Sequence, residues 1–368
     1  MNKRAIAILG GIFLLIVATL VFLILQRRAA NKEEDPVVVE DQTIEEPIEQ
    51  PAETKAIKLT DDQVLSPVLF YQGDGVTYFN RQGELFRNSL QVSGSTVLLA
   101  NKEKLDLPLK AGMSKVLWPQ DSDNYIAEIN NGLRTTYSVY VNDRGGYVDL
   151  PANVTSADWM PTGEQMLYIW LANDKSALYR ANPDNSNFVK LADIWENDDK
   201  IHISPDGKNV LYYRTQSQEA TNNINLVTAD GQTFKSVIKE GYNIGAMWAP
   251  DSKHFLFGKR DPSTEAIGLW MGNIETGEIK FLGVNTTPDK AVWTANSDTV
   301  IVAVPQQQGL SSSLTQDTIY SIKISNSDKQ TFDLGIPLDA ENLFLSLDAD
   351  RVFFKGMQDG GLYYLNLQ

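Results

Sequence analysis

The sequence predicts an all-β fold, a β-propeller of about seven four-stranded blades, with six blades as the alternative count. Two observations predict it. A turn motif recurs at intervals of about 40 to 50 residues, which is the usual length of a propeller blade. Between its copies, short runs of Val, Ile, Tyr, Phe and Trp are separated by Gly, Asp, Asn and Pro, the pattern of strands joined by tight turns.

The clearest copy of the motif is ISPDGKNVL at residues 203–211. Six other stretches align with it, and the last of them is the weakest: WPQDSDNYI from Trp118, WMPTGEQML from Trp159, WAPDSKHFL from Trp248, WTANSDTVI from Trp293, LSLDADRVF from Leu345 and YQGDGVTYF from Tyr71. In the copy at Ile203, Pro205 presets φ for the turn and Gly207 accepts a positive φ at its exit. We expect four strands in this copy: one ending at Ile203, then Asn209–Tyr213, Ile224–Thr228 and Phe234–Ile238.

Aromatic residues recur at fixed positions of the repeat. Trp118, Trp159, Trp248 and Trp293 begin copies of the motif, and the expected third strands carry Tyr179, Trp270, Tyr320 and Tyr363. Because each blade is covered on both faces by its neighbours, we expect these side chains to pack between blades. An aromatic binding platform is the alternative interpretation.

The ring has to close, because an open ring would leave an unpaired strand edge. The last copy supplies strands at Asn342–Leu345, Arg351–Lys355 and Gly361–Leu367, one fewer than a blade needs. We therefore expect Ala56–Leu59, or the run just after it, to form the missing outer strand. Deletion of residues 54–66 should then unfold the domain.

The N-terminal segment predicts a membrane anchor. Ala5–Leu25 holds 21 consecutive uncharged residues, and a helix of this length, about 32 Å, spans a hydrocarbon core of about 30 Å. The run is longer than the apolar region of a cleaved signal peptide and ends in Gln26, Arg27 and Arg28. We expect a cytoplasmic tail at residues 1–4, a retained signal-anchor helix at residues 5–26 and an extracytoplasmic C-terminal domain.

Residues 27–58 are predicted to form a disordered linker, and residues 59–368 the propeller. Between Glu33 and Thr54 the chain is rich in acidic residues and proline and has no basic residue. Such a segment cannot bury enough apolar surface to fold, so it is expected to act as a solvated stalk. An acidic docking motif is the alternative.

The composition disfavours several functions. A net charge of −15 disfavours binding to nucleic acid or to anionic lipid headgroups. No cysteine is present, and the only histidines are His202 and His254, so a thiolate or histidine metal site is not expected. We expect no cofactor and no metal.

At these repeats the chain resembles the TolB-like β-propellers, whose units are of the WSPDGK type, and it is similar to the propeller domains of prolyl oligopeptidase relatives. The copies at residues 203–213 and 248–257 carry the resemblance, which covers roughly residues 60–368. It implies an exported bacterial propeller that binds other proteins or envelope components. TolB itself has six blades and an additional α/β domain, so its assembly role does not transfer to this chain.

Catalytic motifs of related hydrolases are missing, since no G-x-S-x-G elbow and no glycine-rich nucleotide fingerprint occurs. Acid pairs such as Asp198 with Asp199 fall in turns, where solvated loops are the ordinary interpretation. We therefore expect no catalytic residues. A glycan lyase or hydrolase with carboxylates converging at the ring axis is the alternative.

A binding site is expected on the rim formed by the loops after the second strands and by the connections between blades. Surface loops on a rigid scaffold are the usual place for recognition. The candidate residues form a mixed basic and aromatic patch: Trp195, Arg214, Tyr242, Lys259, Arg260 and Asp261. The sequence thus predicts a membrane-anchored binding or scaffold protein of the cell envelope, whose partner is a protein, peptide or glycan.

Overall fold

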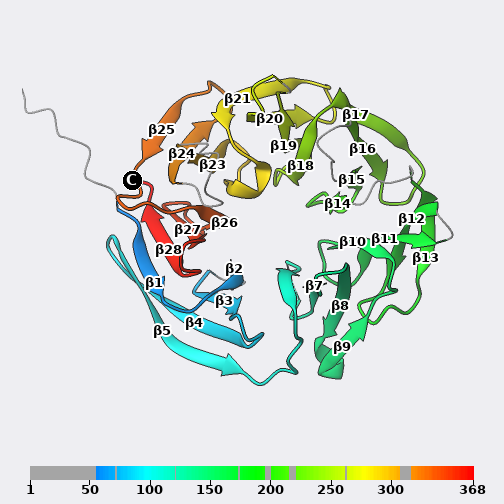
Figure 1. Ribbon diagram of the computed structural model, residues 1–368, viewed down its shortest axis with the longest axis horizontal. Helices are drawn as coiled ribbons and strands as arrows, with labels where there is room; N and C mark the ends of the chain where they lie inside the picture. Colours follow the sequence, from blue (N-terminus) through cyan, green and yellow to red (C-terminus); the bar gives the residue numbers. More distant parts are fainter. Residues whose placement is uncertain are drawn as a thin grey trace, which may run out of the picture. The chain divides into compact units, whose positions relative to one another are not determined.

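The computed structural model describes residues 55–70, 73–120, 122–172, 175–194, 200–214, 221–261, 263–306 and 316–368. These residues form seven antiparallel four-stranded sheets arranged as a ring of blades (Figure 1). The predicted all-β propeller is confirmed, with seven blades as the count. The predicted helix at residues 5–26 and nearly all of the linker lie outside the described residues. Within the described residues, no helix is long and apolar enough to cross a membrane.

The first strand of each blade lies nearest the centre of the ring in Figure 1. Blade 1 contains β2 (Leu65–Leu69), β3 (Gly75–Phe79), β4 (Leu85–Ser93) and β5 (Thr96–Leu105). Blade 2 contains β6 (Met113–Leu117), β7 (Tyr125–Asn130), β8 (Thr135–Val141) and β9 (Gly146–Asp149). Blade 3 contains β10 (Val154–Trp159), β11 (Met166–Ala172), β12 (Lys175–Ala181) and β13 (Val189–Asp193). Blades 4 and 5 contain β14 (Lys200–Ile203), β15 (Asn209–Tyr213), β16 (Asn222–Thr228), β17 (Phe234–Gly241); and β18 (Asn243–Trp248), β19 (His254–Arg260), β20 (Ile267–Asn273), β21 (Ile279–Asn285).

Blade 6 contains β22 (Ala291–Trp293), β23 (Thr299–Pro305), β24 (Asp317–Lys323) and β25 (Lys329–Phe332). Blade 7 combines both ends of the domain, because β26 (Ala340–Leu345), β27 (Arg351–Gly356) and β28 (Leu362–Asn366) are completed by β1 (Ile57–Thr60). Two short 3-10 helices, η1 (Asn142–Arg144) and η2 (Pro288–Lys290), lie in connections.

Ring closure occurs as the sequence predicts. β1 pairs antiparallel with β28, with Ile57 opposite Tyr364, and so becomes the outermost strand of blade 7. The backbone N–H of Ala56 also donates to the carbonyl of Leu334 at 2.9 Å. Both edges that an open ring would expose are therefore paired with each other.

A second contact crosses the same seam. β4 and β5 are the longest strands, and the turn between them reaches blade 7. The hydroxyl of Tyr364 accepts a hydrogen bond from the N–H of Val97 at 3.1 Å, and the carbonyl of Gly94 accepts one from Arg351 at 2.7 Å. Val97 is buried with Phe353 and Tyr364 in a small apolar cluster. The β4–β5 hairpin thus fastens blade 1 to blade 7 in addition to β1.

The same position of the turn motif has a left-handed backbone in several copies of the repeat. Gly207 has φ of 71°, and the equivalent Ser252, Ser297 and Ala349 have φ of 59°, 60° and 59°. Two of these serines also join neighbouring blades, because the Oγ atoms of Ser252 and Ser297 accept the N–H groups of Asp206 and Asp251 at 2.9 Å. Side-chain oxygens that bond successive turns offset the cost of the strained backbone.

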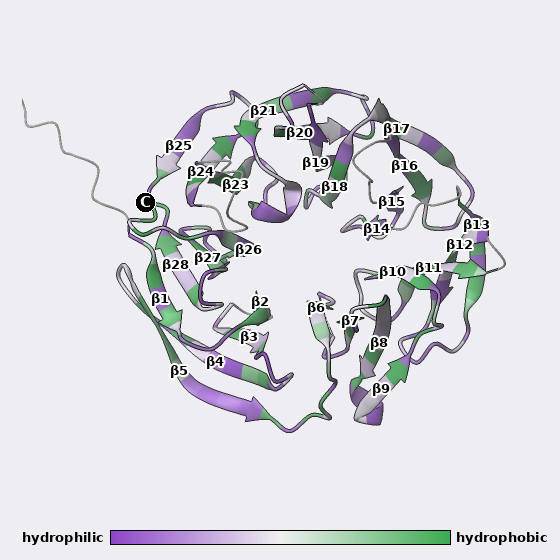
Figure 2. Cartoon of the chain, in the orientation of Figure 1, coloured by the Kyte–Doolittle hydropathy of each residue, from purple (hydrophilic) through white to green (hydrophobic). Residues whose placement is uncertain are grey.

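The core lies between the blades. Figure 2 shows hydrophobic residues along the strands and hydrophilic ones along much of the outer strands β5 and β25. Trp159, Trp248 and Trp293 are buried in clusters that combine two adjacent blades, as predicted. The indole N–H groups of Trp118, Trp159 and Trp248 donate to the preceding blade's first-strand carbonyls, at Ser66, Leu117 and His202. The indole N–H of Trp293 has no partner among the described residues, and nothing in the structure explains this exception.

Candidate binding pockets on the two faces

The alternating direction of the strands gives the ring two faces that carry different connections. We call one the link face, because it carries the connections between blades and the loops after the second strands. The other is the turn face, which carries the turns after the first and third strands. Each face has a pocket lined by aromatic and charged side chains, one on blade 5 and one between blades 1 and 2.

The blade 5 pocket opens on the link face and has a volume of about 540 Å³. Lys259, Arg260 and Asp261 come to it from the end of β19 and the loop that follows, while Trp270 and Phe281 come from β20 and β21. The ring centroids of the two aromatic residues are 5.1 Å apart. The Nζ atom of Lys259 lies 5.7 Å from the centroid of the Trp270 ring. A cation and an aromatic surface are thus presented together.

Local backbone features hold this pocket in place. A Cβ atom on Gly268 would lie 2.9 Å from Phe281 and 3.1 Å from the Trp270 indole nitrogen, so glycine provides the room for both rings. The carboxylate of Asp261 accepts the Ser263 N–H at 2.7 Å and its hydroxyl at 2.6 Å. These hydrogen bonds, the hydroxyl first, lower the pKa of Asp261, so this carboxylate is committed to ordering its own loop.

Only some residues of the sequence-predicted patch line this pocket. Lys259, Arg260 and Asp261 line the pocket. Tyr242 contributes its backbone carbonyl, which accepts the N–H of Arg260 at 2.9 Å. Arg214 is exposed, and its carbonyl accepts a hydrogen bond from the side chain of Asn222 at 3.0 Å. Trp195 lies outside the described residues.

Two pocket residues, Trp270 and Phe281, lie outside the sequence-predicted patch. The repeat position of Trp270 on a third strand predicts packing, and this residue does pack against the core between blades 4 and 5. It nevertheless keeps a surface toward the pocket. Phe281, on the outermost strand, is 45% exposed. The sequence feature that could have indicated this pocket residue is an aromatic side chain on an outer strand.

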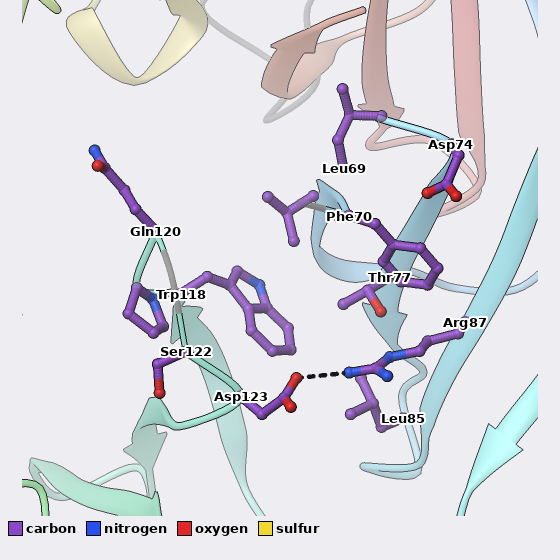
Figure 3. A pocket seen from close by; sticks show the side chains of 12 residues that line it. Leu69, Phe70, Asp74, Thr77, Leu85, Arg87, Trp118, Gln120, Ser122 and Asp123 are labelled. Atoms are coloured by element: carbon purple, nitrogen blue, oxygen red, sulfur yellow. Dashed lines mark hydrogen bonds and ion pairs between the residues drawn. The ribbon is translucent and has the colours of Figure 1, made fainter. Parts of the chain in front are cut away.

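The pocket between blades 1 and 2 opens on the turn face and has a volume of about 500 Å³ (Figure 3). Phe70 and Asp74 belong to the turn after β2, Arg87 to β4, and Trp118 and Asp123 to the turn after β6. An Nη atom of Arg87 lies 2.9 Å from a carboxylate oxygen of Asp123. The Arg87 guanidinium also lies over the Phe70 ring, 5.3 Å from its centroid. Trp118, predicted as a packing residue, therefore also lines a pocket.

Ionisable groups of the first strands are engaged within the protein. The carboxylate of Asp158 accepts the N–H groups of Trp159 and Ile203, each at 2.9 Å. Burial raises the pKa of Asp158 to about 6 despite these bonds. A ring nitrogen of His202 lies 3.2 Å from the hydroxyl of Tyr213. Burial, with the nearby charges of Lys115 and Lys200, lowers the pKa of His202 to about 3.

A buried ion cluster joins blades 6 and 7. The Nζ atom of Lys290 lies 2.6 Å from Asp317 and 2.5 Å from Asp339. Asp317 also accepts the N–H of Ala340 at 2.9 Å. Burial alone would lower the pKa of Lys290, but the hydrogen bonds to the two carboxylates outweigh it and raise that pKa. The described residues contain no group of three or more His, Cys, Asp or Glu side chains arranged to hold a metal ion.

Comparison of the sequence with protein-family models and with curated proteins gives no match. Several solved structures share the fold at low identity. Hydrazine synthase from Kuenenia stuttgartiensis is 10% identical with a TM-score of 0.58, over 84% of this chain and 97% of that one. Oligogalacturonate lyase from Vibrio parahaemolyticus is 10% identical with a TM-score of 0.58, over 87% and 92% of the two chains.

The tricorn protease is 12% identical with a TM-score of 0.52, and the match covers 87% of this chain but 34% of the protease. This chain therefore spans about a third of the protease's length. TolB from Acinetobacter baumannii is 14% identical over 80% of this chain and 79% of its own, with a TM-score of 0.45, which is too low to support an argument. Together with the observed blades, these likenesses show the fold: the chain is a seven-bladed β-propeller.

Proposed function

We propose that this propeller is a membrane-anchored binding protein of the cell envelope, which takes an anionic segment of a protein, peptide or glycan into the blade 5 pocket. One observation carries the proposal. Three residues of the sequence-predicted patch, Lys259, Arg260 and Asp261, line one pocket with the Trp270 and Phe281 rings. Of these charged groups, Asp261 is committed to its loop and Arg260 lies 3.2 Å from a carboxylate oxygen of Glu265. Lys259 and the two rings therefore form the basic and aromatic surface. Such surfaces are favoured at binding sites.

The buried ionisable groups described above give the enzyme alternative no support. Asp158 accepts two backbone N–H groups, His202 lies beside Tyr213, and Lys290 is paired with Asp317 and Asp339. Each of these groups is held by partners within the protein. A general acid or base must instead reach a substrate proton.

Site-specific photo-crosslinking in the full-length, membrane-extracted protein tests the binding site. A photoreactive phenylalanine analogue at Phe281 is expected to form a defined adduct, because this position is 45% exposed and lines the pocket. The same analogue at Phe234, which is 43% exposed on blade 4, is the matched control. The combined substitutions Lys259→Ala and Arg260→Ala should remove the Phe281 adduct. Identical adducts at both positions, or an adduct unaffected by the substitutions, would contradict the proposal.

The anchor is tested separately. With residues 1–26 present, the protein should remain in membranes after carbonate extraction, and deletion of these residues should release it. A reporter enzyme that works only outside the cytoplasm should be active when it is fused after Gln368, and one that works only in the cytoplasm should be inactive there. Release of the intact protein by carbonate, or activity of a cytoplasm-specific reporter at the same position, would reject the tether or its orientation.

A further inference from the structure

The pocket between blades 1 and 2 has no role in the proposed function. Its walls are aromatic, from Phe70 and Trp118, and its charged residues are Asp74, Arg87 and Asp123. We propose that this pocket binds an arginine or lysine side chain presented by an extended polypeptide partner. The site would lie on the opposite face from the blade 5 pocket, so the propeller would hold two partners of different charge.

The aromatic walls are preorganised. The Trp118 ring stacks on Phe79 with centroids 5.7 Å apart and planes 16° apart, and its N–H donates to the carbonyl of Ser66 at 2.8 Å. The Phe70 ring occupies space that only glycine allows at position 75, since a Cβ atom there would lie 2.7 Å from the ring. Walls that are fixed before binding lose little conformational entropy when a ligand arrives.

The charges favour a cation. Arg87 shows that the pocket accommodates a guanidinium, because its own guanidinium lies between the Phe70 ring and Asp123. Asp74 is exposed at the edge of the pocket and forms no ion pair with any described residue. The pocket is lined by one arginine and two aspartates, and the chain as a whole carries a net charge of −15. Both the local and the long-range field therefore attract a basic group.

The size of the pocket favours a polypeptide over a small free amine. A volume of about 500 Å³ exceeds what one basic side chain fills and lies within the usual range for ligand pockets, about 300–1,000 Å³. Gln120 and Ser122 line the side opposite Arg87, as Figure 3 shows. Their side chains can bond the amide groups of a peptide backbone beside the inserted cation.

The test is calorimetric titration of the full-length protein with the probe acetyl-Ala-Ala-Arg-Ala-Ala-amide. The same peptide with citrulline in place of arginine is the neutral control, and we expect it to bind roughly tenfold more weakly, since it keeps the shape and loses the charge. N-acetylarginine amide, which lacks the flanking residues, should also bind more weakly than the peptide. Equal affinity for the arginine and citrulline peptides would overturn the cation site, and equal affinity for the single residue would overturn the polypeptide partner.

Two substitutions should act in opposite directions. Asp74→Asn should weaken binding of the arginine peptide by about threefold, the effect of losing one exposed ion pair. Arg87→Gln should strengthen binding, because it removes the internal competitor for Asp123. Glu278→Gln, the same loss of charge at an exposed site on blade 5, should leave the affinity unchanged. Loss of binding in Arg87→Gln with no effect of Asp74→Asn would identify an anion site and overturn the proposal, while the blade 5 crosslinking test would be unaffected.

Discussion

At the scale of single residues, the repeat position in the turn after the first strand constrains the backbone. Gly207 and Ala349 both have a left-handed backbone there, with φ of 71° and 59°. An alanine in this conformation places its Cβ too close to the following carbonyl, which costs about 1–2 kcal/mol. Glycine does not have this cost.

Exchanging the two residue types should therefore give opposite effects on the free energy of unfolding. Ala349→Gly should stabilise the propeller by about 0.5–1 kcal/mol. Gly207→Ala should destabilise it by about 1–2 kcal/mol, because its new Cβ would also lie 3.1 Å from Pro161. Urea unfolding followed by circular dichroism measures both. Changes of the same sign would show that backbone conformation does not control stability at this position.

Two titratable groups on neighbouring first strands should give stability opposite dependences on pH. The pKa of His202 is lowered to about 3 by burial, so its stabilising contribution is complete above about pH 6.5 and is lost as the pH falls. The pKa of Asp158 is raised to about 6 by burial, so its contribution is complete below about pH 3.8 and is lost as the pH rises through 6.

When the pH falls from 7 to 5, the titration of His202 should therefore lower the free energy of unfolding by about 2 kcal/mol, and that of Asp158 should raise it by about 1 kcal/mol. The variant His202→Gln should gain stability over this range, and Asp158→Asn should lose more than the unsubstituted protein does. Unfolding free energies measured across the range decide the matter. If both variants keep the original pH slope, neither group titrates as its burial implies.

At the scale of elements, the β4–β5 hairpin acts across the seam where the ring closes. Its bond from the Val97 N–H to the Tyr364 hydroxyl is buried. Tyr364→Phe would leave that donor without a partner and should cost about 1–2 kcal/mol. Hydrogen exchange at Val97 should accelerate selectively. Tyr320→Phe, which removes a hydroxyl with no hydrogen-bond partner among the described residues, is the control, and an equal cost in both variants would argue against a role for the hairpin.

The positions of the strands could be predicted from the sequence, because each strand has its own apolar run between turn residues. In blade 4, β15 has the predicted bounds, whereas β16 begins at Asn222 and β17 continues to Gly241, beyond the predicted limits. The added residues depend on Asn222, whose side chain bonds the backbone of Asn243 in the next blade. Strand ends were less predictable because contacts between blades determine them.

At the scale of the whole molecule, stability should depend on closure. β1 contributes only four residues, yet it covers the edge of β28 and completes blade 7. Deletion of residues 1–60 should therefore abolish the cooperative unfolding transition of the entire domain and make every blade sensitive to limited proteolysis. The control is deletion of residues 1–50, which leaves β1 in place. A deletion to residue 60 that still unfolds cooperatively would show that the hairpin alone closes the ring.

The candidate sites show where sequence reasoning reached its limit. Lys259, Arg260 and Asp261 are consecutive residues at the end of β19 and the start of the loop that follows, so their proximity was evident from the chain itself. Trp118 and Trp270 occupy repeat positions that predict packing, and both do pack. Whether such a ring also keeps a surface toward a pocket depends on the neighbouring side chains, which the repeat does not specify.

The sequence by itself determined the four-stranded blade and the region that closes the ring, because these follow from local turn chemistry and from the period of apolar runs. The structure decided between the predicted seven blades and the alternative of six. Only the tertiary structure decided which charged groups are paired and where pockets remain. Arg87 and Asp123 lie 36 residues apart in the chain and meet because two blades pack side by side. Pockets and ion pairs of this kind are properties of contacts between blades, which no single repeat contains.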